Sequence, residues 1–280
     1  MNIAHHSPTV RGRRLARELR VVRENSGMSA ERAAAALGWS RHKVNRIETA
    51  RTRPSVKDVE NAVDLYGASA SVRTALVQLA REAAQRGWWA AFSDVLGSSY
   101  VGLEDEATTI RSRQVQTVPG LLQTPDYARA LIQTAIPYDH AGAERRVQAR
   151  LARQALLTRS VPPSLAAVVD EAVLRRLVGT PQIMHDQLRA LLPQAARPTV
   201  KMRVLPFTRG TIGVEGSFVV LGFADELDPD VGYVESIGGS LFLESATQVA
   251  RCNLTFERIW DAALPEEASA DLITALMKEL

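Results

Sequence analysis

Side chains that donate hydrogen bonds gather on one short segment near the start of the chain. In the run SRHKVNRIE, residues 40–48, one side of a helix carries His42, Asn45 and Arg46 with Arg41 beside them, and the apolar residues fall on the other side. Forked and directional donors of this kind suit the edges of bases in the major groove and the phosphates beside them. The segment therefore predicts a helix that reads double-stranded DNA.

Two short helices joined by a tight turn are expected to hold these residues in place. Ser29 can cap a first helix over residues 30–37, and Gly38 suits the left-handed backbone that ends it. Ser40 can then cap the second helix, residues 41–48. This arrangement is a helix-turn-helix.

The flanking sequence completes a small helical domain. Apolar residues at helical spacing predict further helices over residues 13–26, 56–66 and 71–86. We therefore expect an all-α helix-turn-helix domain over residues 1–86. A second, α+β domain with an antiparallel sheet is expected over residues 87–280.

Charge is distributed unevenly between these two parts. The 280-residue chain carries a net charge of +3, yet residues 11–57 hold thirteen Lys or Arg and four Asp or Glu, a balance of +9. The remainder therefore carries 3 − 9 = −6. A basic segment attached to an acidic body is expected when one domain meets a polyanion and the other does not.

Other features narrow the class of protein. The single cysteine, Cys252, excludes an intrachain disulfide and a cysteine-cluster zinc site. No apolar run approaches the roughly 20 residues of a membrane span. The first ten residues lack the pattern of a signal peptide, so we expect a cytoplasmic protein without a membrane association.

The second domain is expected to mix helices and strands. Helices are predicted over residues 103–116, 143–158, 182–192 and 246–263, and two more are predicted to start at residues 125 and 269. Strands are predicted over residues 165–169, 200–205, 218–223, 232–235 and 241–243. Glycine-rich and Asp-Pro turns separate the last four strands, which indicates an antiparallel meander.

We expect no enzyme. The sequence lacks the nucleophile elbow, the zinc-protease motif and the phosphate-binding glycine loops. Asp170, Glu171 and Glu235 could form an acidic pair in a pocket, but acids that follow a strand more often cap helices or pair with arginine. No cofactor and no metal site are predicted.

The first domain resembles the lambda-repressor-like (Xre-type) DNA-binding domain. The resemblance rests on SAERAAAALGWSRHKVNRIE followed by a basic loop, a proline and a helix. It implies that Arg41, His42 and Asn45 read bases. The residues that it implies at phosphates or the groove edge are Ser40, Lys43, Arg46, Arg51 and Arg53.

The same resemblance implies a structural ion pair and shows two departures. Arg23 and Glu48 match the positions that commonly pair in that family. Ala30 stands where many members have a phosphate-contacting glutamine, and Ala50 replaces the usual glycine after the second helix. If the backbone of Ala50 is left-handed, its Cβ costs about 1 kcal/mol.

The second domain resembles the C-terminal domain of actinobacterial antitoxin-like helix-turn-helix regulators. VPGLLQTPDYARALI is its most specific motif, and VVDEAVLRRLVG, VLPFTRG and GSFVVLGF also fit. The resemblance implies a role in binding a partner or an effector, often a small protein encoded by an adjacent gene.

Together these observations predict a sequence-specific DNA-binding transcriptional regulator that forms a homodimer. Its C-terminal domain would mediate dimerisation, partner binding or both. The alternative is an antitoxin-like interaction module that sequesters a small partner protein and binds DNA mainly for autoregulation. A weaker third hypothesis is a sensor whose sheet holds a small ligand.

Overall fold

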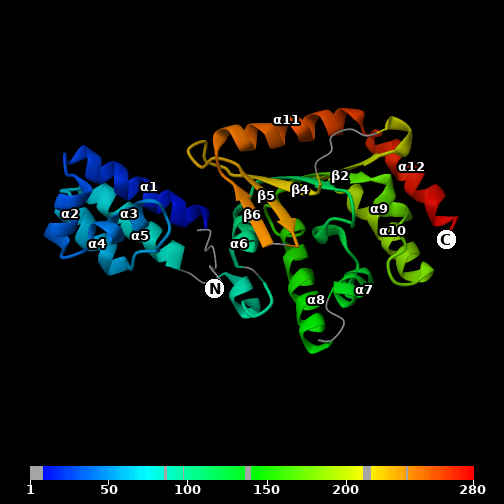
Figure 1. Ribbon diagram of the computed structural model, residues 1–280, viewed down its shortest axis with the longest axis horizontal. Coiled ribbons are helices and arrows are strands. Elements are labelled where there is room, and N and C mark those ends of the chain that lie inside the picture. Colours follow the sequence, from blue (N-terminus) through cyan, green and yellow to red (C-terminus); the bar gives the residue numbers. More distant parts are fainter. Residues whose placement is uncertain (1–8, 85–86, 97, 136–139, 211–215, 238) are drawn as a thin grey trace. The chain divides into compact units, whose positions relative to one another are not determined.

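The computed structural model describes residues 9–84, 87–96, 98–135, 140–210, 216–237 and 239–280. The chain divides into two compact units (Figure 1). Unit 1 comprises Met1–Ala91 and Gly97–Glu106, and unit 2 comprises Phe92–Leu96 and Ala107–Leu280. The single boundary expected after residue 86 stays a prediction.

Unit 1 begins with five helices. They are α1 (Val10–Asn25), α2 (Ala30–Leu37), α3 (Arg41–Glu48), α4 (Val56–Leu65) and α5 (Ala70–Ala84). A 3-10 helix, η1 (Trp88–Phe92), follows and ends on the first residue of unit 2, and helix α6 (Ser98–Glu106) completes unit 1. The predicted all-α helix-turn-helix region is confirmed.

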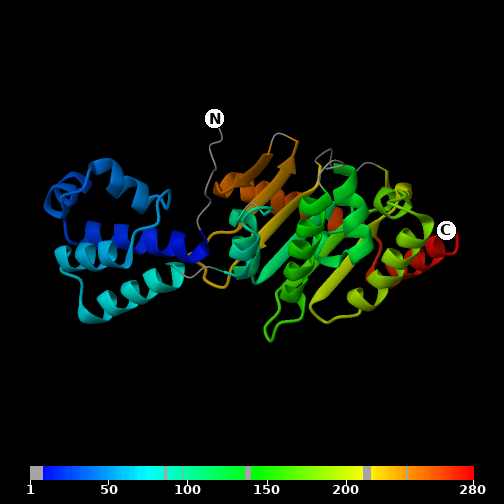
Figure 2. The same cartoon turned by 90° about the horizontal axis from the view of Figure 1, so that it is seen from below.

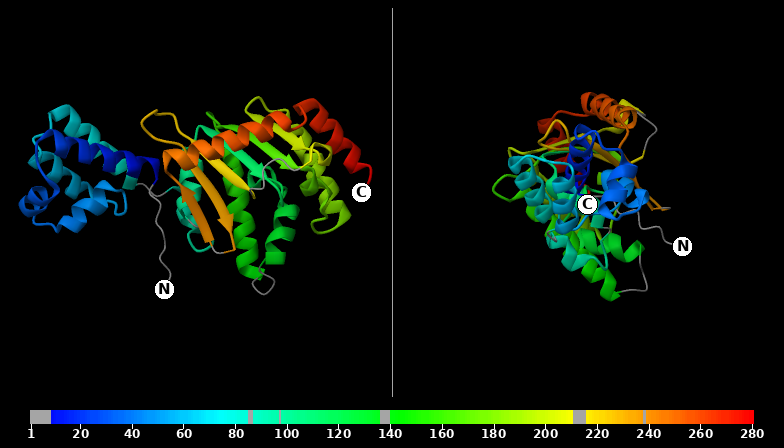
Figure 3. Two further views of the ribbon diagram at one scale, coloured as in Figure 1. Left: turned by 45° about the horizontal axis from the view of Figure 1, so that its top comes forward. Right: turned by 90° about the vertical axis from the view of Figure 1, so that its left-hand side faces the viewer.

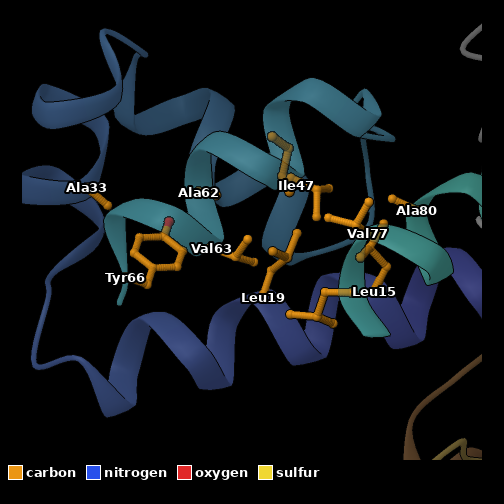
Figure 4. Close-up of a cluster of buried hydrophobic side chains, with 11 residues drawn as sticks. Leu15, Leu19, Ala33, Ile47, Ala62, Val63, Tyr66, Val77 and Ala80 are labelled. Carbon is orange, nitrogen blue, oxygen red and sulfur yellow. The ribbon is translucent and has the colours of Figure 1, made fainter. Parts of the chain in front are cut away.

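One apolar cluster holds α1 to α5 together, and Figure 4 shows how its side chains converge. Each helix contributes buried residues: Leu15 and Leu19 from α1, Ala33 from α2, Ile47 from α3, Val59, Ala62 and Val63 from α4, and Leu76, Val77 and Ala80 from α5. Because the cluster draws on all five helices, α3 is fixed by packing along its inner side.

Unit 2 is built on a six-stranded mixed sheet. Its strands are β1 (Thr109–Gln114), β2 (Ser164–Asp170), β3 (Val200–Leu205), β4 (Phe218–Gly222), β5 (Val231–Ser236) and β6 (Gly239–Leu243), in the order β3-β2-β1-β4-β5-β6. The pairs β1–β4, β4–β5 and β5–β6 are antiparallel, whereas β1–β2 and β2–β3 are parallel. The α+β class is therefore confirmed for the second region.

Helices cover both faces of this sheet. They are α7 (Pro125–Ala135), α8 (His140–Gln154), α9 (Glu171–Arg175), α10 (Pro181–Ala195), α11 (Ala246–Ala262) and α12 (Glu266–Met277). Helix α11 runs along one face, and α7 and α8 lie on the other (Figures 1 and 2). Figure 3 shows α11 crossing the strands. Phe256 and Ile259 of α11 belong to the same buried cluster as Val220 of β4. Among the described helices, none is long and apolar enough to cross a membrane.

Two details of the predicted second domain are wrong. The helix expected over residues 103–116 ends at Glu106, and residues 109–114 form β1 instead. Strand β1 is central, and its hydrogen-bonding partners lie near residues 165 and 220, so local spacing does not reveal it. The expected four-strand meander contains only β4, β5 and β6, because β3 joins the far edge through the helical crossover that parallel strands require.

Candidate nucleic-acid interface

The turn between α2 and α3 is set by two serines and one glycine. The Ser29 hydroxyl accepts a hydrogen bond from the Arg32 N–H at 3.2 Å, and the Ser40 hydroxyl accepts one from the Lys43 N–H at 3.1 Å. Gly38 ends α2 with φ of +67°, a conformation that glycine adopts without a steric cost. These local interactions determine where α3 begins.

Helix α3 turns one side to the core and the other to solvent. Val44 and Ile47 are 2% and 3% exposed, whereas Arg41, His42 and Asn45 are exposed. The exposed face predicted from the sequence is therefore present. It consists of side chains that can donate hydrogen bonds in the major groove.

A bidentate ion pair anchors the end of α3 to α1. The Nε of Arg23 donates to Oε1 of Glu48 at 2.6 Å, and its Nη2 donates to Oε2 at 2.8 Å. The Nη1 of Arg23 also donates to the Met28 carbonyl at 2.7 Å. Both charged side chains are more than nine-tenths buried, and the two parallel hydrogen bonds tie the end of α3 to α1.

The first residue of α3 is held by a carboxylate on α2. The Nε of Arg41 lies 2.8 Å from Oε1 of Glu31, and both side chains remain largely exposed. The backbone N–H of Glu31, the Ser29 hydroxyl and the Arg41 charge lower the pKa of the Glu31 carboxyl. Arg41 is thus oriented by an acid on the same surface, a contact that sequence reasoning missed.

Lys43 is engaged within the unit. Its Nζ lies 2.8 Å from Oδ1 of Asp58 and 4.0 Å from the centre of the Trp39 ring. Burial raises the pKa of Asp58, but the hydrogen bonds from Lys43 and Ser55 outweigh it, so the pKa is lowered. A phosphate contact by Lys43 would have to share or replace this ion pair.

The basic loop after α3 is braced at both ends. The Nε of Arg46 donates to the Thr52 hydroxyl at 2.8 Å, and Nη1 of Arg53 donates to the Ala83 carbonyl at 3.2 Å. Ala50 has φ of +56°, the left-handed conformation considered from the sequence. Two of the predicted phosphate-contacting residues therefore also hold the loop in shape.

The remaining candidates have unengaged side chains. Within the described part of the chain, the side chains of His42, Asn45 and Arg51 make no hydrogen bond or ion pair, and all three residues are exposed. Their donors are available to a ligand without breaking a contact. The roles predicted for them at bases and phosphates stay predictions.

Two protein families match the chain. A family described as a helix-turn-helix domain matches residues 14–76, which span α2 and α3. The family described as Domain of unknown function (DUF5753) matches residues 98–275, more than half of the chain. The chain belongs to the DUF5753 family. Comparison with curated proteins and with solved structures found no match.

The helix-turn-helix match makes this DUF5753 member a DNA-binding regulator. The match covers most of α1, all of α2 to α4 and part of α5, and it includes every residue predicted to contact DNA. The match to the second region carries no function in its description.

Two of the three acids singled out from the sequence, Asp170 and Glu171, serve the fold. Oδ1 of Asp170 caps α9 by accepting from the Ala172 N–H at 2.9 Å. Glu171 accepts from Nε of Arg175 at 2.7 Å and from the Phe207 N–H at 2.9 Å. Asp170 therefore caps a helix and Glu171 pairs with an arginine, the two roles expected of acids that follow a strand.

Some contacts of the interface had no clear signal in the sequence. The Glu31–Arg41 pair joins two helices, and the Lys43–Asp58 pair joins residues 15 positions apart. The spacing of Ser55 and Asp58 could have been identified as a capping box, because the Ser55 hydroxyl and the Asp58 carboxylate each accept from the other's N–H. That Asp58 also receives Lys43 depends on the packing of α3 against α4.

Proposed function

We propose that the chain is a cytoplasmic, sequence-specific transcriptional regulator that acts as a homodimer, with α3 in the major groove. The observation that carries the proposal is the exposed face of α3. His42 and Asn45 present free donors there, beside an Arg41 that Glu31 orients.

The way α3 is held supports specific reading. Base contacts discriminate only when the side chains sit at fixed positions along the groove. The Ser40 cap at the start of α3 and the buried Arg23–Glu48 pair at its end provide that constraint. Val44 and Ile47 hold the helix between these two ends.

The loop after α3 supports backbone contacts beside the bases. Arg51 is exposed and its neighbour Thr52 is tied back to Arg46 through the Thr52 N–H, 3.0 Å from the Arg46 carbonyl. Phosphate contacts position a DNA-binding protein without reading sequence. We assign Arg51 to this class and Asn45 to base reading.

Titration against DNA tests the proposal. The full chain is titrated against the promoter of its own operon and against a duplex of the same length and composition in scrambled order, at one fixed salt concentration. Tighter binding to the promoter, or to a duplex selected from a random pool, is expected. Equal affinity for every duplex would refute sequence-specific binding.

The alternative is an antitoxin-like module, and one observation gives it weight. The core of α1 to α5 is complete within unit 1, so unit 2 is available for another task such as binding a small protein. Repeating the titration with the product of the adjacent gene separates the two proposals. Complex formation with that product together with loss of promoter binding would favour the antitoxin-like role.

A further inference from the structure

The two edges of the sheet in unit 2 differ. At the β3 edge, the N–H of Val204 donates to the Ser269 hydroxyl at 2.9 Å, and the Val204 carbonyl accepts from the Leu264 N–H at 2.9 Å. Strand β3 also carries the charged residues Lys201 and Arg203. Covering elements and charges are the usual protection against strand addition at an edge.

The β6 edge has neither protection. Among the residues that the structure describes, no group outside β5 hydrogen-bonds to the backbone of residues 239–243. The strand, GSLFL, contains no charge and no proline. Since antiparallel hydrogen bonds point alternately to the two sides of a strand, β6 presents free N–H and C=O groups on its outer side. Figure 1 shows β6 as the outermost strand of the sheet.

The apolar face beneath α11 continues onto this edge. Leu241 lies opposite Val234 on β5, and Val234 packs against the cluster that includes Phe256. Leu241 itself is 57% exposed. A further strand alongside β6 would extend the sheet and bury this side chain.

We propose that the strand that completes this edge is β6 of a second copy of the chain, paired antiparallel about a two-fold axis at Leu241. The inference rests on the proposed function, since helix-turn-helix regulators bind paired half-sites as two-fold dimers. A two-fold axis requires the same surface on both partners, and an antiparallel pair of identical strands meets that requirement.

The strand itself selects the register. With the axis at Leu241, residue 239 pairs with 243, 240 with 242, and 241 with itself, so all five residues of β6 find a partner. Any other axis leaves part of the strand unpaired. This register also places Leu241 against its counterpart and brings no like charges directly opposite one another, which would weaken the pairing.

Cysteine crosslinking tests the register directly. Directly opposed residues of antiparallel strands have Cα atoms about 4.5–5.5 Å apart, within the range of a disulfide. Leu241→Cys in a Cys252→Ala background should therefore form a disulfide-linked dimer under mild oxidation. Lys201→Cys is the matched control, because Lys201 is exposed on the covered β3 edge. This variant should migrate as a monomer on gels run without reducing agent. Crosslinking no faster at 241 than at 201 would overturn the proposed pairing.

A charge substitution tests whether the edge sustains the dimer. Leu241→Lys places two like charges across the axis and should weaken self-association by about tenfold or more in sedimentation equilibrium. Leu254→Lys is the control, because Leu254 is 59% exposed on α11, and it should associate like the wild type. Circular dichroism checks that each variant folds. Equal association of the two variants, or a wild-type chain that stays monomeric, would overturn the inference.

Failure of the inference and failure of the proposed function are distinguishable. If the chain dimerises through another surface, Leu241→Lys still forms the dimer and still binds the promoter. If the chain does not bind DNA specifically, the wild type and Leu254→Lys still form the β6 dimer, but none of the three proteins prefers the promoter to the scrambled duplex.

Discussion

Replacing Ala50 with glycine should stabilise unit 1. Its φ of +56° is the only positive φ among the described residues other than glycine. A left-handed backbone costs an L-residue about 1–2 kcal/mol, whereas glycine adopts it freely but loses about 0.4–1 kcal/mol through the greater freedom of the unfolded chain. The balance predicts that Ala50→Gly stabilises unit 1 by about 1 kcal/mol.

Native-state hydrogen exchange measures this effect within unit 1 alone. The slowest-exchanging amides of α1 and α4 report the free energy of unfolding of the helical core. A gain of about 1 kcal/mol slows their exchange about fivefold. The expected direction is a stabilisation, and thermal unfolding should show a correspondingly higher melting temperature.

The same substitution in a helix supplies the control. Ala35 is exposed on α2, where glycine costs about 0.5–1 kcal/mol relative to alanine. Ala35→Gly should therefore speed exchange while Ala50→Gly slows it. If both variants lose stability, the strain argument at Ala50 is wrong and the loop has another source of stability.

Three further substitutions test other parts of unit 1. Glu48→Gln should cost about 3 kcal/mol because it leaves the buried Arg23 charge with only the exposed Glu24 carboxylate, 3.5 Å away, as a counter-charge. The midpoint of urea unfolding should therefore fall, and an unchanged midpoint would show that the Arg23–Glu48 pair is dispensable. Glu31→Gln frees Arg41 and removes a negative charge from the DNA-facing surface. Affinity for promoter and scrambled DNA alike should therefore rise a few-fold, the order expected of one exposed charge. A fall in promoter affinity would instead show that Glu31 positions Arg41 on the DNA. Burial and the nearby Glu48 raise the pKa of Tyr66 to about 12 from its usual 10, so the fold binds the phenol proton more tightly and loses stability as the pH rises from 10 towards 12. Tyr66→Phe should lose less over that interval, and identical alkaline losses would contradict the assignment.

The helix-turn-helix was predictable because its signals are local. Ser29, Gly38 and Ser40 act on backbone groups within a few residues, and they place the ends of α2 and α3 where the sequence predicts them. The phase of Val44 and Ile47 then determines which side chains face solvent. A pattern of this kind needs no knowledge of the rest of the fold.

The sheet was less predictable because its partners are distant. Arg111 in β1 pairs in register with Ala166 and Val220, and its side chain reaches Asp230 and Asn253. The short run TIRSRQ, with its arginines two residues apart, gives no sign of these contacts. The same reason explains why β3 was expected beside β4 rather than at the far edge.

The ion pairs beside the DNA-facing residues were also not predictable from the sequence. The sequence predicts which cations α3 exposes, but not that Glu31 holds Arg41 and Asp58 holds Lys43. These pairs depend on how α2, α3 and α4 pack. They divide the predicted contacts into residues that are free, such as Asn45, and residues that are already engaged.

Specific reading by α3 is the central claim, and the ratio of promoter to scrambled-DNA affinity tests it most directly. For the full chain at fixed salt, Asn45→Ala should reduce the discrimination by about 1–3 kcal/mol, the value of a bidentate base contact. Arg51→Ala should weaken both complexes equally and reduce the slope of log affinity against log salt by about one unit. If Asn45→Ala leaves the ratio unchanged, α3 does not read the bases and the account is contradicted.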